Sequence, residues 1–455
     1  MSSQTLRLVH KTHYNTQIFH PLATPSTTLP PSTLRIRTSL LGLGSNNLSY
    51  CAAGDLLHWW DAYPPPTDVD IPAPHNDTDL AAYGIAPGWG YATVLDSTIP
   101  EIAAGRILYG FIPISGHAVD LTLRRVEGTG FNGTHWIEVS EQRAKVMNLY
   151  QRYMVMPDTF SLPANDSKQG AKQGQGVHVD PLTLFTPVLK PVWEAGWLLA
   201  RYVFAQSAES TPDPVHPLGE AVSPWSAREA DLSDACIVCV ASGTKTARSF
   251  LEELARIALA DGKGEKPSYS VLEVTGGKAG CERYIKDVPF QHELVGYDEI
   301  GAEVFKKQKY RKYVLLNFGG RDNALARVGT AIKEANPDAE TVCVQIGGEA
   351  KVYSGEELAV RRETAEALGA VQMNTTGIRD EVMRRVGEEK YFGEMNGAFE
   401  KVVREQIGAF DGAVLGVRVK VSEGLRGEDG LEGCWERLCA GGIAGDEGLV
   451  VRLGA

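Results

Sequence analysis

Short apolar segments separated by Gly, Pro and Asp run through the first 184 residues. This pattern is typical of β-rich structure, because strands are brief and end where the chain turns. The strands expected from it cover 34–41, 91–94 and 106–112. Polar loops are expected over 64–79 and 161–176.

Strand and helix patterns alternate from about residue 185, beginning with a helix expected over 190–206. The strands that follow are expected at 236–240, 270–275, 292–297, 312–317 and 341–346. Helices are expected between them at 247–259, 277–286, 298–307 and 322–335. Such alternation predicts right-handed crossovers and a parallel sheet that is covered on both faces.

The rest of the chain is mostly helical and charged. Its expected helices cover 356–368, 396–408 and 431–440, and its expected strands cover 413–421 and 449–453. Because it contains two strands, this tail is expected to rejoin the β-rich part. The predicted domains are therefore a β-rich unit made of 1–184 and 376–455, and a parallel-sheet unit made of 185–375.

Composition and charge narrow the kinds of partner. The 455 residues are 43% apolar and 22% charged, which is typical of a soluble globular protein of two domains. The formal charge of −12 argues against a nucleic-acid partner and fits a small-molecule ligand. No apolar run reaches about 18 residues and residues 1–20 lack a secretion signal, so no membrane contact and a cytoplasmic location are expected.

The segment ACIVCVASGTKTAR at 235–248 carries the strongest functional signal. An apolar strand ends in small and hydroxyl residues and a helical pattern follows, which is where a doubly wound sheet holds a dinucleotide phosphate. The candidate phosphate-binding residues are Ser242, Gly243, Thr244, Lys245 and Thr246. Only Gly243 remains of the G-x-G-x-x-G pattern, so capping of the helix by Ser and Thr is an equal alternative.

The ends of later strands supply further candidate cofactor contacts. The second strand ends at Thr275 and is followed by Lys278 rather than by a carboxylate, which favours the 2′-phosphate of NADP over the ribose of NAD. A solvated lysine is the alternative. Asn317 and Gly347 stand at the ends of the fourth and fifth strands, where glycine-containing turns either admit a nicotinamide or serve only as tight turns.

Three stretches resemble the medium-chain dehydrogenase/reductase superfamily. They are LRIRTSLLGLGSNNLSYCAAGD at 34–55, GRILYGFIP at 105–113 and GLEGCWERLCAGGIAGDEGLVVRL at 430–453. A closer resemblance is to a family of medium-chain-reductase-like proteins of unknown function with a Ser/Thr-rich phosphate loop. Its motif N-N-x-x-Y-x-x-x-G-D is matched by Asn46, Asn47, Tyr50, Gly54 and Asp55, and its motif P-x-W-G-x-A by PGWGYA at 87–92.

The resemblance implies an α/β fold of two domains. A GroES-like β-rich domain would be built from both chain ends, and a Rossmann-like, doubly wound parallel sheet would lie between them. Members of the superfamily are often dimers through the nucleotide-binding sheet, so the resemblance also allows a homodimer.

The seven cysteines argue against disulfide bonds and against a bound metal ion. Their odd number and irregular spacing argue against a disulfide framework. Cys236 and Cys239 form a C-x-x-C inside an apolar run, which favours buried small residues over a redox or metal site. Zinc-dependent members of the superfamily use a Cys and a His, but Cys51 has no such partner at motif spacing and the four-cysteine zinc lobe is absent. No metal is therefore expected.

Candidate catalytic residues lie in the N-terminal turn. Tyr50 can donate a proton, and Asn46 or Asn47 can hold a carbonyl oxygen. His117 is a weaker candidate acid or base. A structural role is the competing interpretation for each of these four residues.

These features predict a zinc-independent, NADP-linked reductase of an activated alkene, enone or polyketide-like carbonyl bound in the interdomain cleft. Two alternatives stay open. In the first, the fold has lost its cofactor and performs isomerisation, cyclisation or other acid/base chemistry. In the second, the protein binds a small molecule without catalysis.

Overall fold

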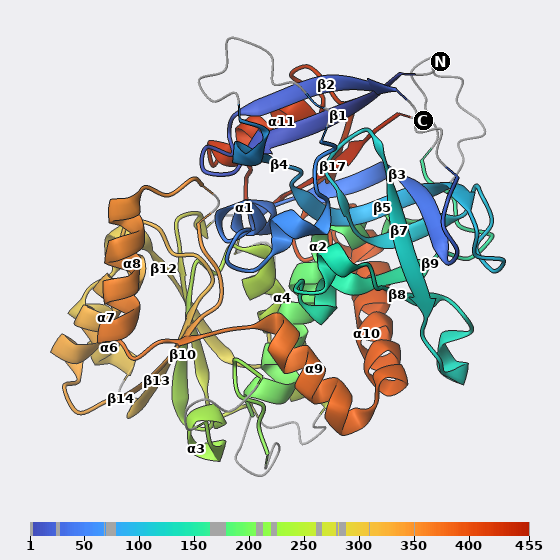
Figure 1. The fold of residues 1–455 in the computed structure, drawn as a ribbon. Coiled ribbons are helices and arrows are strands. Elements are labelled where there is room, and N and C mark those ends of the chain that lie inside the picture. The colour runs from blue at the N-terminus through green and yellow to red at the C-terminus, as the bar shows by residue number, and fades with distance from the viewer. Residues whose placement is uncertain are drawn as a thin grey trace.

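The computed structural model places both chain ends on the same side of a β-rich part (Figure 1). It describes residues 3–23, 28–67, 69, 79–163, 179–205, 213–219, 225–260, 266–278, 281, 288–308, 310–349 and 351–454. None of the described helices combines the length and apolarity required to span a bilayer.

A closed barrel forms the centre of the β-rich part. Its strands run in the order β3-β5-β6-β9-β8-β7, and pairing of β7 with β3 closes the circle. They are β3 (Thr33–Leu43), β5 (Pro87–Ser97), β6 (Ile107–Pro113), β7 (Ala118–Arg125), β8 (His135–Glu138) and β9 (Arg152–Val155). Fully buried apolar side chains such as Leu34, Ile36 and Leu40 drive this closure, because they leave water only inside the barrel. The expectation of a GroES-like β-rich domain is confirmed.

Both chain ends add strands to this part. β17 (Glu447–Arg452) pairs antiparallel with β3, and β16 (Arg418–Glu423) pairs parallel with β17. The tail thus pairs with the barrel through β17. At the other end, β1 (Ser3–His10), β2 (Gln17–Ala23) and β4 (Tyr83–Gly84) form a separate three-stranded sheet.

The middle of the chain forms a six-stranded sheet in the order β12-β11-β10-β13-β14-β15, with every neighbouring pair parallel. Its strands are β10 (Ala235–Val240), β11 (Ser270–Thr275), β12 (Gln291–Gly296), β13 (Lys312–Asn317), β14 (Glu340–Gln345) and β15 (Val371–Gln372). In chain order this is 3-2-1-4-5-6, the order of dinucleotide-binding sheets, which reverses between β10 and β13. The Rossmann-like α/β expectation is confirmed, as is the burial of Cys236 and Cys239.

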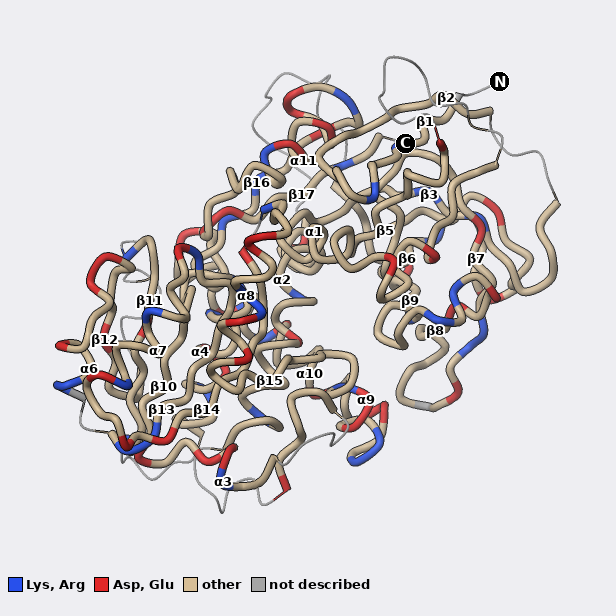
Figure 2. Tube along the Cα trace, turned by 60° about the vertical axis from the view of Figure 1, so that its left-hand side comes forward, with Lys and Arg blue, Asp and Glu red and all other residues tan. Residues whose placement is uncertain are grey.

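Helices cover the sheet and join it to the barrel. They are α1 (Ser45–Ala52), α2 (Pro181–Leu198), α3 (Ala227–Ala230), α4 (Lys245–Ala260), α6 (Ala302–Gln308), α7 (Ala324–Ala335), α8 (Gly355–Ala367), α9 (Thr375–Val386), α10 (Glu388–Ala409) and α11 (Leu431–Cys439). α2 contacts α4, α9 and α10 as well as β3, β5 and β17, so it belongs to both parts. Acidic and basic residues are interspersed along α6 and α9, as expected of exposed helix faces (Figure 2).

The helix expected over 190–206 starts too late. α2 begins at Pro181 and ends at Leu198, where one π-helical turn, Leu199–Val203, follows. Pro187 and Pro191 lie inside it. Pro191 has no N–H for the carbonyl of Pro187, and that carbonyl lies against Gly42, where a Cβ would approach to 2.4 Å. The Pro187 carbonyl thus loses its helical partner where the helix packs closely on the barrel. The prolines also make this helix hard to recognise in the sequence.

Other boundaries also differ from expectation. The strand expected over 413–421 begins only at Arg418, because Leu415 and Gly416 take positive φ values of 51° and 66° and turn the chain. Strands β1, β2, β7, β8 and β9 were not expected, since their polar and charged positions break the apolar runs. The helix expected over 277–286 falls largely outside the described residues.

Candidate functional site

The loop after β10 lies where the strand order reverses. Ala241 takes a positive φ of 65°, and the amides of Ala241 and Ser242 both donate to the carbonyl of Val274 (2.9 and 3.2 Å). The Thr244 hydroxyl accepts from the amide of Ala247 (3.4 Å), so Thr244 caps α4. The capping interpretation therefore applies to this hydroxyl. The positive end of the α4 dipole points to the same place.

Protein atoms limit the space beside Gly243. A Cβ at Gly243 would lie 3.4 Å from the Thr275 hydroxyl and 3.8 Å from the Cys281 sulfur. The turn before β17 approaches from another side, where a Cβ on Gly445 would lie 2.9 Å from the Gly243 carbonyl. Ser242 is buried, and its hydroxyl lies 3.8 Å from the sulfur of Cys281. Ser242 is thus turned inward, whereas the four residues after it are partly exposed.

Two titratable groups flank this loop. Burial, together with the charge of Arg248, lowers the pKa of Lys245 to about 8, although acidic residues at the start of β17 oppose the change. Glu273 of β11 is 1% exposed. Burial raises its pKa to about 7, while the Ser242 hydroxyl and the Arg248 charge oppose the rise. Near neutral pH the loop is therefore backed by a carboxyl group that readily takes up a proton.

Lys278 lies beyond β11, as the sequence places it, and it is paired. Its ammonium forms an ion pair with Glu299, and both side chains are partly exposed. Next to it, a Cβ on Gly276 would lie 3.5 Å from the Tyr297 ring and 3.9 Å from the Arg321 guanidinium. Tyr297 and Arg321 thus gather with Lys278 at the carboxyl ends of β11, β12 and β13. Sequence reasoning missed both, although Tyr297 ends the strand expected over 292–297 and Arg321 follows the turn after the next strand.

Asn317 and Gly347 belong to two turns that pack on each other. The Oδ1 atom of Asn317 accepts from the amides of Gly319 (3.2 Å) and Gly320 (2.8 Å), and its carbonyl accepts from the amide of Gly347 (3.1 Å). Gly319 has a φ of 119°, and a Cβ there would lie 2.6 Å from the carbonyl of Gly348. Glycine is required at this position for the packing of the two turns, which supports the tight-turn interpretation.

The two motifs of the N-terminal part meet at Tyr50. The Tyr50 hydroxyl accepts from Trp89 Nε1 (3.0 Å) and from Asn46 Nδ2 (3.2 Å). Asn47 is fully buried and holds backbone instead, since its Oδ1 accepts from the amide of Gly44 (2.8 Å) at the start of α1 and its Nδ2 donates to a carbonyl of β5. Asn46 therefore lies at the Tyr50 hydroxyl, whereas Asn47 shapes the turn.

The environment of Tyr50 keeps its phenol protonated. Burial raises the pKa of Tyr50, and hydrogen bonds from Asn46 and Trp89 oppose the rise. The hydroxyl oxygen accepts these two bonds, and the Tyr150 side chain is a further hydrogen-bonding neighbour. The ring packs edge-on against Trp59 and Tyr150, with centroids 4.8 and 5.5 Å away. Tyr50 is thus a buried phenol that its neighbours hold rigidly.

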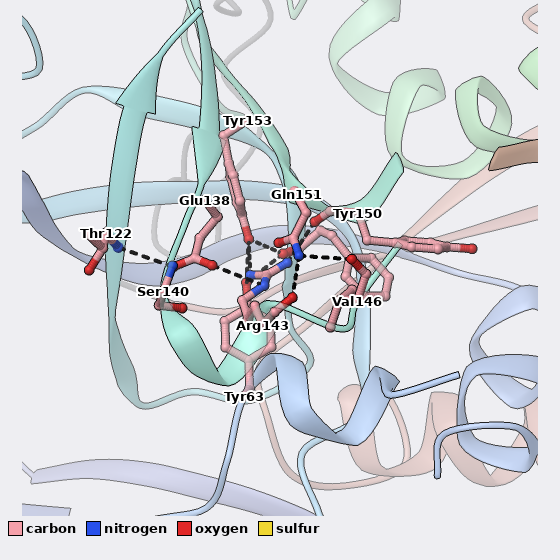
Figure 3. A network of polar contacts seen from close by, with 10 residues as sticks. Tyr63, Thr122, Glu138, Ser140, Arg143, Val146, Tyr150, Gln151 and Tyr153 are labelled. Carbon is pink, nitrogen blue, oxygen red and sulfur yellow. Dashed lines mark hydrogen bonds and ion pairs between the residues drawn. The ribbon is translucent and has the colours of Figure 1, made fainter. Parts of the chain in front are cut away.

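Tyr150 connects this aromatic cluster to a buried polar network (Figure 3). Its carbonyl accepts from Arg143 Nη2 (2.6 Å). The other terminal nitrogen of Arg143 donates to the hydroxyls of Tyr153 (2.8 Å) and Tyr63 (3.4 Å). Both tyrosine hydroxyls in turn reach the carbonyl of Phe111 at 2.5 Å. The guanidinium therefore fixes the backbone that positions Tyr150.

Glu138 balances the charge of this network. Its Oε2 lies 3.5 Å from Arg143 Nε, and both side chains are buried. Its Oε1 accepts from the amides of Thr122 (3.3 Å) and Ser140 (3.2 Å). Buried charges persist only when they are paired and hydrogen-bonded, so the two residues hold each other in place. The sequence did not indicate the network around Arg143 and Glu138, because no local spacing links its residues.

His117 and Cys51 lie in surroundings that do not suit acid/base or metal chemistry. His117 is buried, its Nδ1 lies 2.9 Å from the Ser115 hydroxyl, and burial lowers its pKa to about 4. That hydroxyl also accepts from the amide of Arg7 in β1 (2.7 Å), so His117 is a neutral side chain at the contact between β1 and the barrel. Cys51 is buried as well. Within the described part of the chain, no group of three or more His, Cys, Asp or Glu residues is placed to hold a metal ion.

Several solved structures are similar to this chain over nearly its whole length. They include CurA in complex with NADPH from Vibrio vulnificus (11% identity, TM-score 0.47, 100% of both chains). Quinone oxidoreductase from Escherichia coli complexed with NADPH has 11% identity and a TM-score of 0.46, covering 98% of this chain and 99% of that chain. The Etr1p/NADP/crotonyl-CoA complex has 9% identity and a TM-score of 0.48, covering 99% of this chain and 100% of that chain. Identities and TM-scores this low transfer no chemistry to this chain.

No curated protein matches the sequence. One family model, however, matches residues 41–444. This range includes the Tyr50 turn, the PGWGYA motif, the whole parallel sheet and the loop after β10. The match spans far more than half of the chain, and the chain therefore belongs to the family described as Protein of unknown function (DUF2855).

Proposed function

We propose that this protein is a zinc-independent, NADP-linked reductase of an activated alkene, enone or polyketide-like carbonyl. The observation that carries the proposal is the strand order β12-β11-β10-β13-β14-β15, with the capped helix α4 starting at its point of reversal. Parallel sheets of this order bind ligands beyond the carboxyl ends of their strands at that point. A helix N-terminus there favours a phosphate through its free amides and its dipole.

The residues at this edge of the sheet fit NADP better than NAD. Lys278 and Arg321 bring two positive charges to the carboxyl ends of β11 and β13, and the ring of Tyr297 lies beside Gly276. No carboxylate directly follows β11 to bind a ribose. Both side chains of the Lys278–Glu299 pair are partly exposed, so solvent weakens the pair and a 2′-phosphate could replace Glu299.

In this proposal, NADPH bound at Ser242–Thr246 supplies a hydride. Tyr50 supplies the proton, because burial keeps its phenol neutral while Trp89 and Asn46 donate to its oxygen. Asn46 is partly exposed and lies at that hydroxyl, so it is the amide suited to hold a substrate oxygen. These side chains provide proton donation and oxygen binding without zinc.

One observation favours a redox-silent enzyme of the same fold. The turn before β17 contacts the loop after β10, with a Cβ on Gly445 lying 2.9 Å from the Gly243 carbonyl. A loop closed by protein atoms would bind no pyrophosphate. The Tyr50 turn would then serve isomerisation, cyclisation or another acid/base step.

Thermal unfolding with added NADPH or NADH distinguishes the two candidates. A ligand that binds only the native state stabilises it by about 2.7 kcal/mol at a concentration about 100 times its Kd. We expect NADPH to raise the Tm, and NADH to raise it less, because only NADPH carries the 2′-phosphate. If neither dinucleotide shifts the Tm at millimolar concentration, the reductase is excluded and the redox-silent enzyme is favoured.

A further inference from the structure

A cavity lies where the barrel, α2 and the pair α9–α10 meet. It is partly open to solvent, and its empty space, including the open part, is about 380 Å³. Its walls include Trp89 and Tyr109 from the barrel, Lys190 and Glu194 from α2, Arg379 from α9 and Phe392 from α10. α10 contacts the barrel strands β8 and β9, since Phe392 packs on His135 and Glu388 pairs with Arg152. Because the Trp89 indole donates to the Tyr50 hydroxyl, the cavity adjoins the Tyr50 turn.

Three cations and one carboxylate line this cavity. Arg152, Lys190, Arg379 and Glu194 are only 8%, 8%, 4% and 7% exposed. The carboxylate of Glu194 is already engaged, since its Oε1 accepts from the Tyr391 hydroxyl (2.5 Å) and lies 3.4 Å from Arg379. The wall therefore carries an excess of positive charge, and Glu194 does not satisfy Lys190.

Lys190 has no oxygen partner among the described residues. Its ammonium lies 4.0 Å from the sulfur of Met154 and 5.2 Å from the centre of the Tyr109 ring. A thioether and an aromatic face are weak partners for a buried charge, which an anion or water ordinarily stabilises. Burial lowers the pKa of Lys190 to about 8, which leaves it mainly charged at neutral pH. The ammonium is thus a binding group without a bound acceptor.

We propose that this cavity binds the carboxylate of a small organic anion, with Lys190 as its main ion-pair partner. The positive wall selects an anion, and the surfaces of Trp89, Tyr109 and Phe392 select one with a hydrocarbon body. The assignment of this anion as the substrate that Tyr50 protonates rests on the proposed reductase function. The binding of the anion in this cavity does not depend on that function.

Arg152 lines the cavity and also contacts residues of a second, wider hollow, whose empty space is about 810 Å³. The hollow is lined by Phe131 and Glu388, and the carboxylate of Glu388 pairs with Arg152. The guanidinium also stacks on Phe131 and Phe392, 5.7 and 4.6 Å from their ring centres. Glu388 therefore competes for a cation that an incoming carboxylate would meet first.

Isothermal titration calorimetry near pH 7, on the full chain without cofactor, tests the proposal with butyrate as the probe. We expect butyrate to bind at least about tenfold more tightly than butyramide, which has the same shape without the charge. Lys190→Met keeps a side chain of similar length and should weaken butyrate binding by at least about tenfold. Lys401→Met, at an exposed lysine of α10, should leave the affinity unchanged.

Glu388→Gln should change the affinity for butyrate in the opposite direction to Lys190→Met. Removing the competing carboxylate should tighten butyrate binding by about threefold, because Arg152 becomes available. Equal affinities for butyrate and butyramide, or an unchanged affinity in folded Lys190→Met, would overturn the proposal. If Lys190→Met does not fold, an unchanged affinity in Glu388→Gln would overturn it instead.

The same preparations separate this proposal from the reductase. Stabilisation by NADPH is measured beside butyrate binding. Butyrate binding without NADPH stabilisation contradicts only the reductase and supports the anion cavity. NADPH stabilisation without butyrate binding contradicts only the anion cavity.

Discussion

Glu273 allows a quantitative test of the environment behind the loop after β10. It lies on β11 opposite Cys239 of β10 and is 1% exposed. Neither of its carboxyl oxygens receives a hydrogen bond of ordinary geometry from the described residues. Glu273→Gln keeps the shape of the side chain and removes the ionisable group, so it isolates the cost of burying this charge.

The magnitude follows from the pKa of Glu273, which burial raises from 4.5 to about 7. One pKa unit corresponds to about 1.4 kcal/mol, so ionisation of Glu273 costs the native state about 3 kcal/mol relative to the unfolded chain. Below pH 4.5 the group is protonated in both states and costs nothing. Between pH 4.5 and 7 only the native state retains the proton, so native stability falls as the pH rises. Above pH 7 the loss is complete.

Urea denaturation at about pH 5.5 and pH 8 measures this loss. The stability of Glu273→Gln relative to the wild type should rise by about 2 kcal/mol between these pH values, because the wild type already carries part of the loss at the lower one. Glu334→Gln, at an exposed carboxylate of α7, is the control and should show no such change. A relative stability of Glu273→Gln that is the same at both pH values would refute the reasoning.

Three further substitutions test the remaining parts of the site. Tyr50→Phe keeps the ring but loses the hydroxyl, so turnover of a reducible substrate should fall by about 10²–10⁴ while stability changes by about 1 kcal/mol; unchanged turnover would exclude Tyr50 as the proton donor. Arg321→Ala should weaken NADPH binding about tenfold in a fluorescence titration and spare NADH, because only NADPH offers a 2′-phosphate. Equal losses for both dinucleotides would remove Arg321 from that site. Arg143→Met leaves Glu138 buried without its ion pair and should cost about 3–5 kcal/mol in urea denaturation. Arg125→Met, at an exposed pair, should cost less than about 1 kcal/mol, and similar losses in the two variants would contradict the role of burial.

The parallel sheet could be predicted because its strands are encoded locally. β10 and β11 are short runs buried at every position, and each is followed by a turn residue and a helix pattern. The barrel was harder to predict because strands such as β7 and β8 contain charged residues that interrupt their apolar pattern. The start of α2 was missed because prolines mask a helix whose burial comes from both parts of the molecule. The domain boundaries at 184/185 and 375/376, and a homodimer, stay predictions.

The candidate site shows the same division between local and distant information. The sequence placed Tyr50 in a turn with two asparagines, but only the fold distinguishes Asn46, at the Tyr50 hydroxyl, from Asn47, which holds backbone. Likewise, Lys278 was identified as a cation beyond β11, and the structure supplies Glu299 as its partner. Lys190 interrupts an apolar helix, which could have marked it as unusual, yet the cavity around it is assembled from seven separate elements.

The sequence by itself determined the alternation of strands and helices in the parallel sheet and the residue types available at the strand ends. These features depend on near neighbours, because turn formation and the burial of alternate or consecutive side chains are properties of short segments. Only the tertiary structure decided which polar groups are paired, which carboxyl or ammonium group is desolvated, and which aromatic rings enclose a cavity. Those properties depend on atoms that folding brings together from distant parts of the chain. These atoms determine the pKa and the partners of a buried charge.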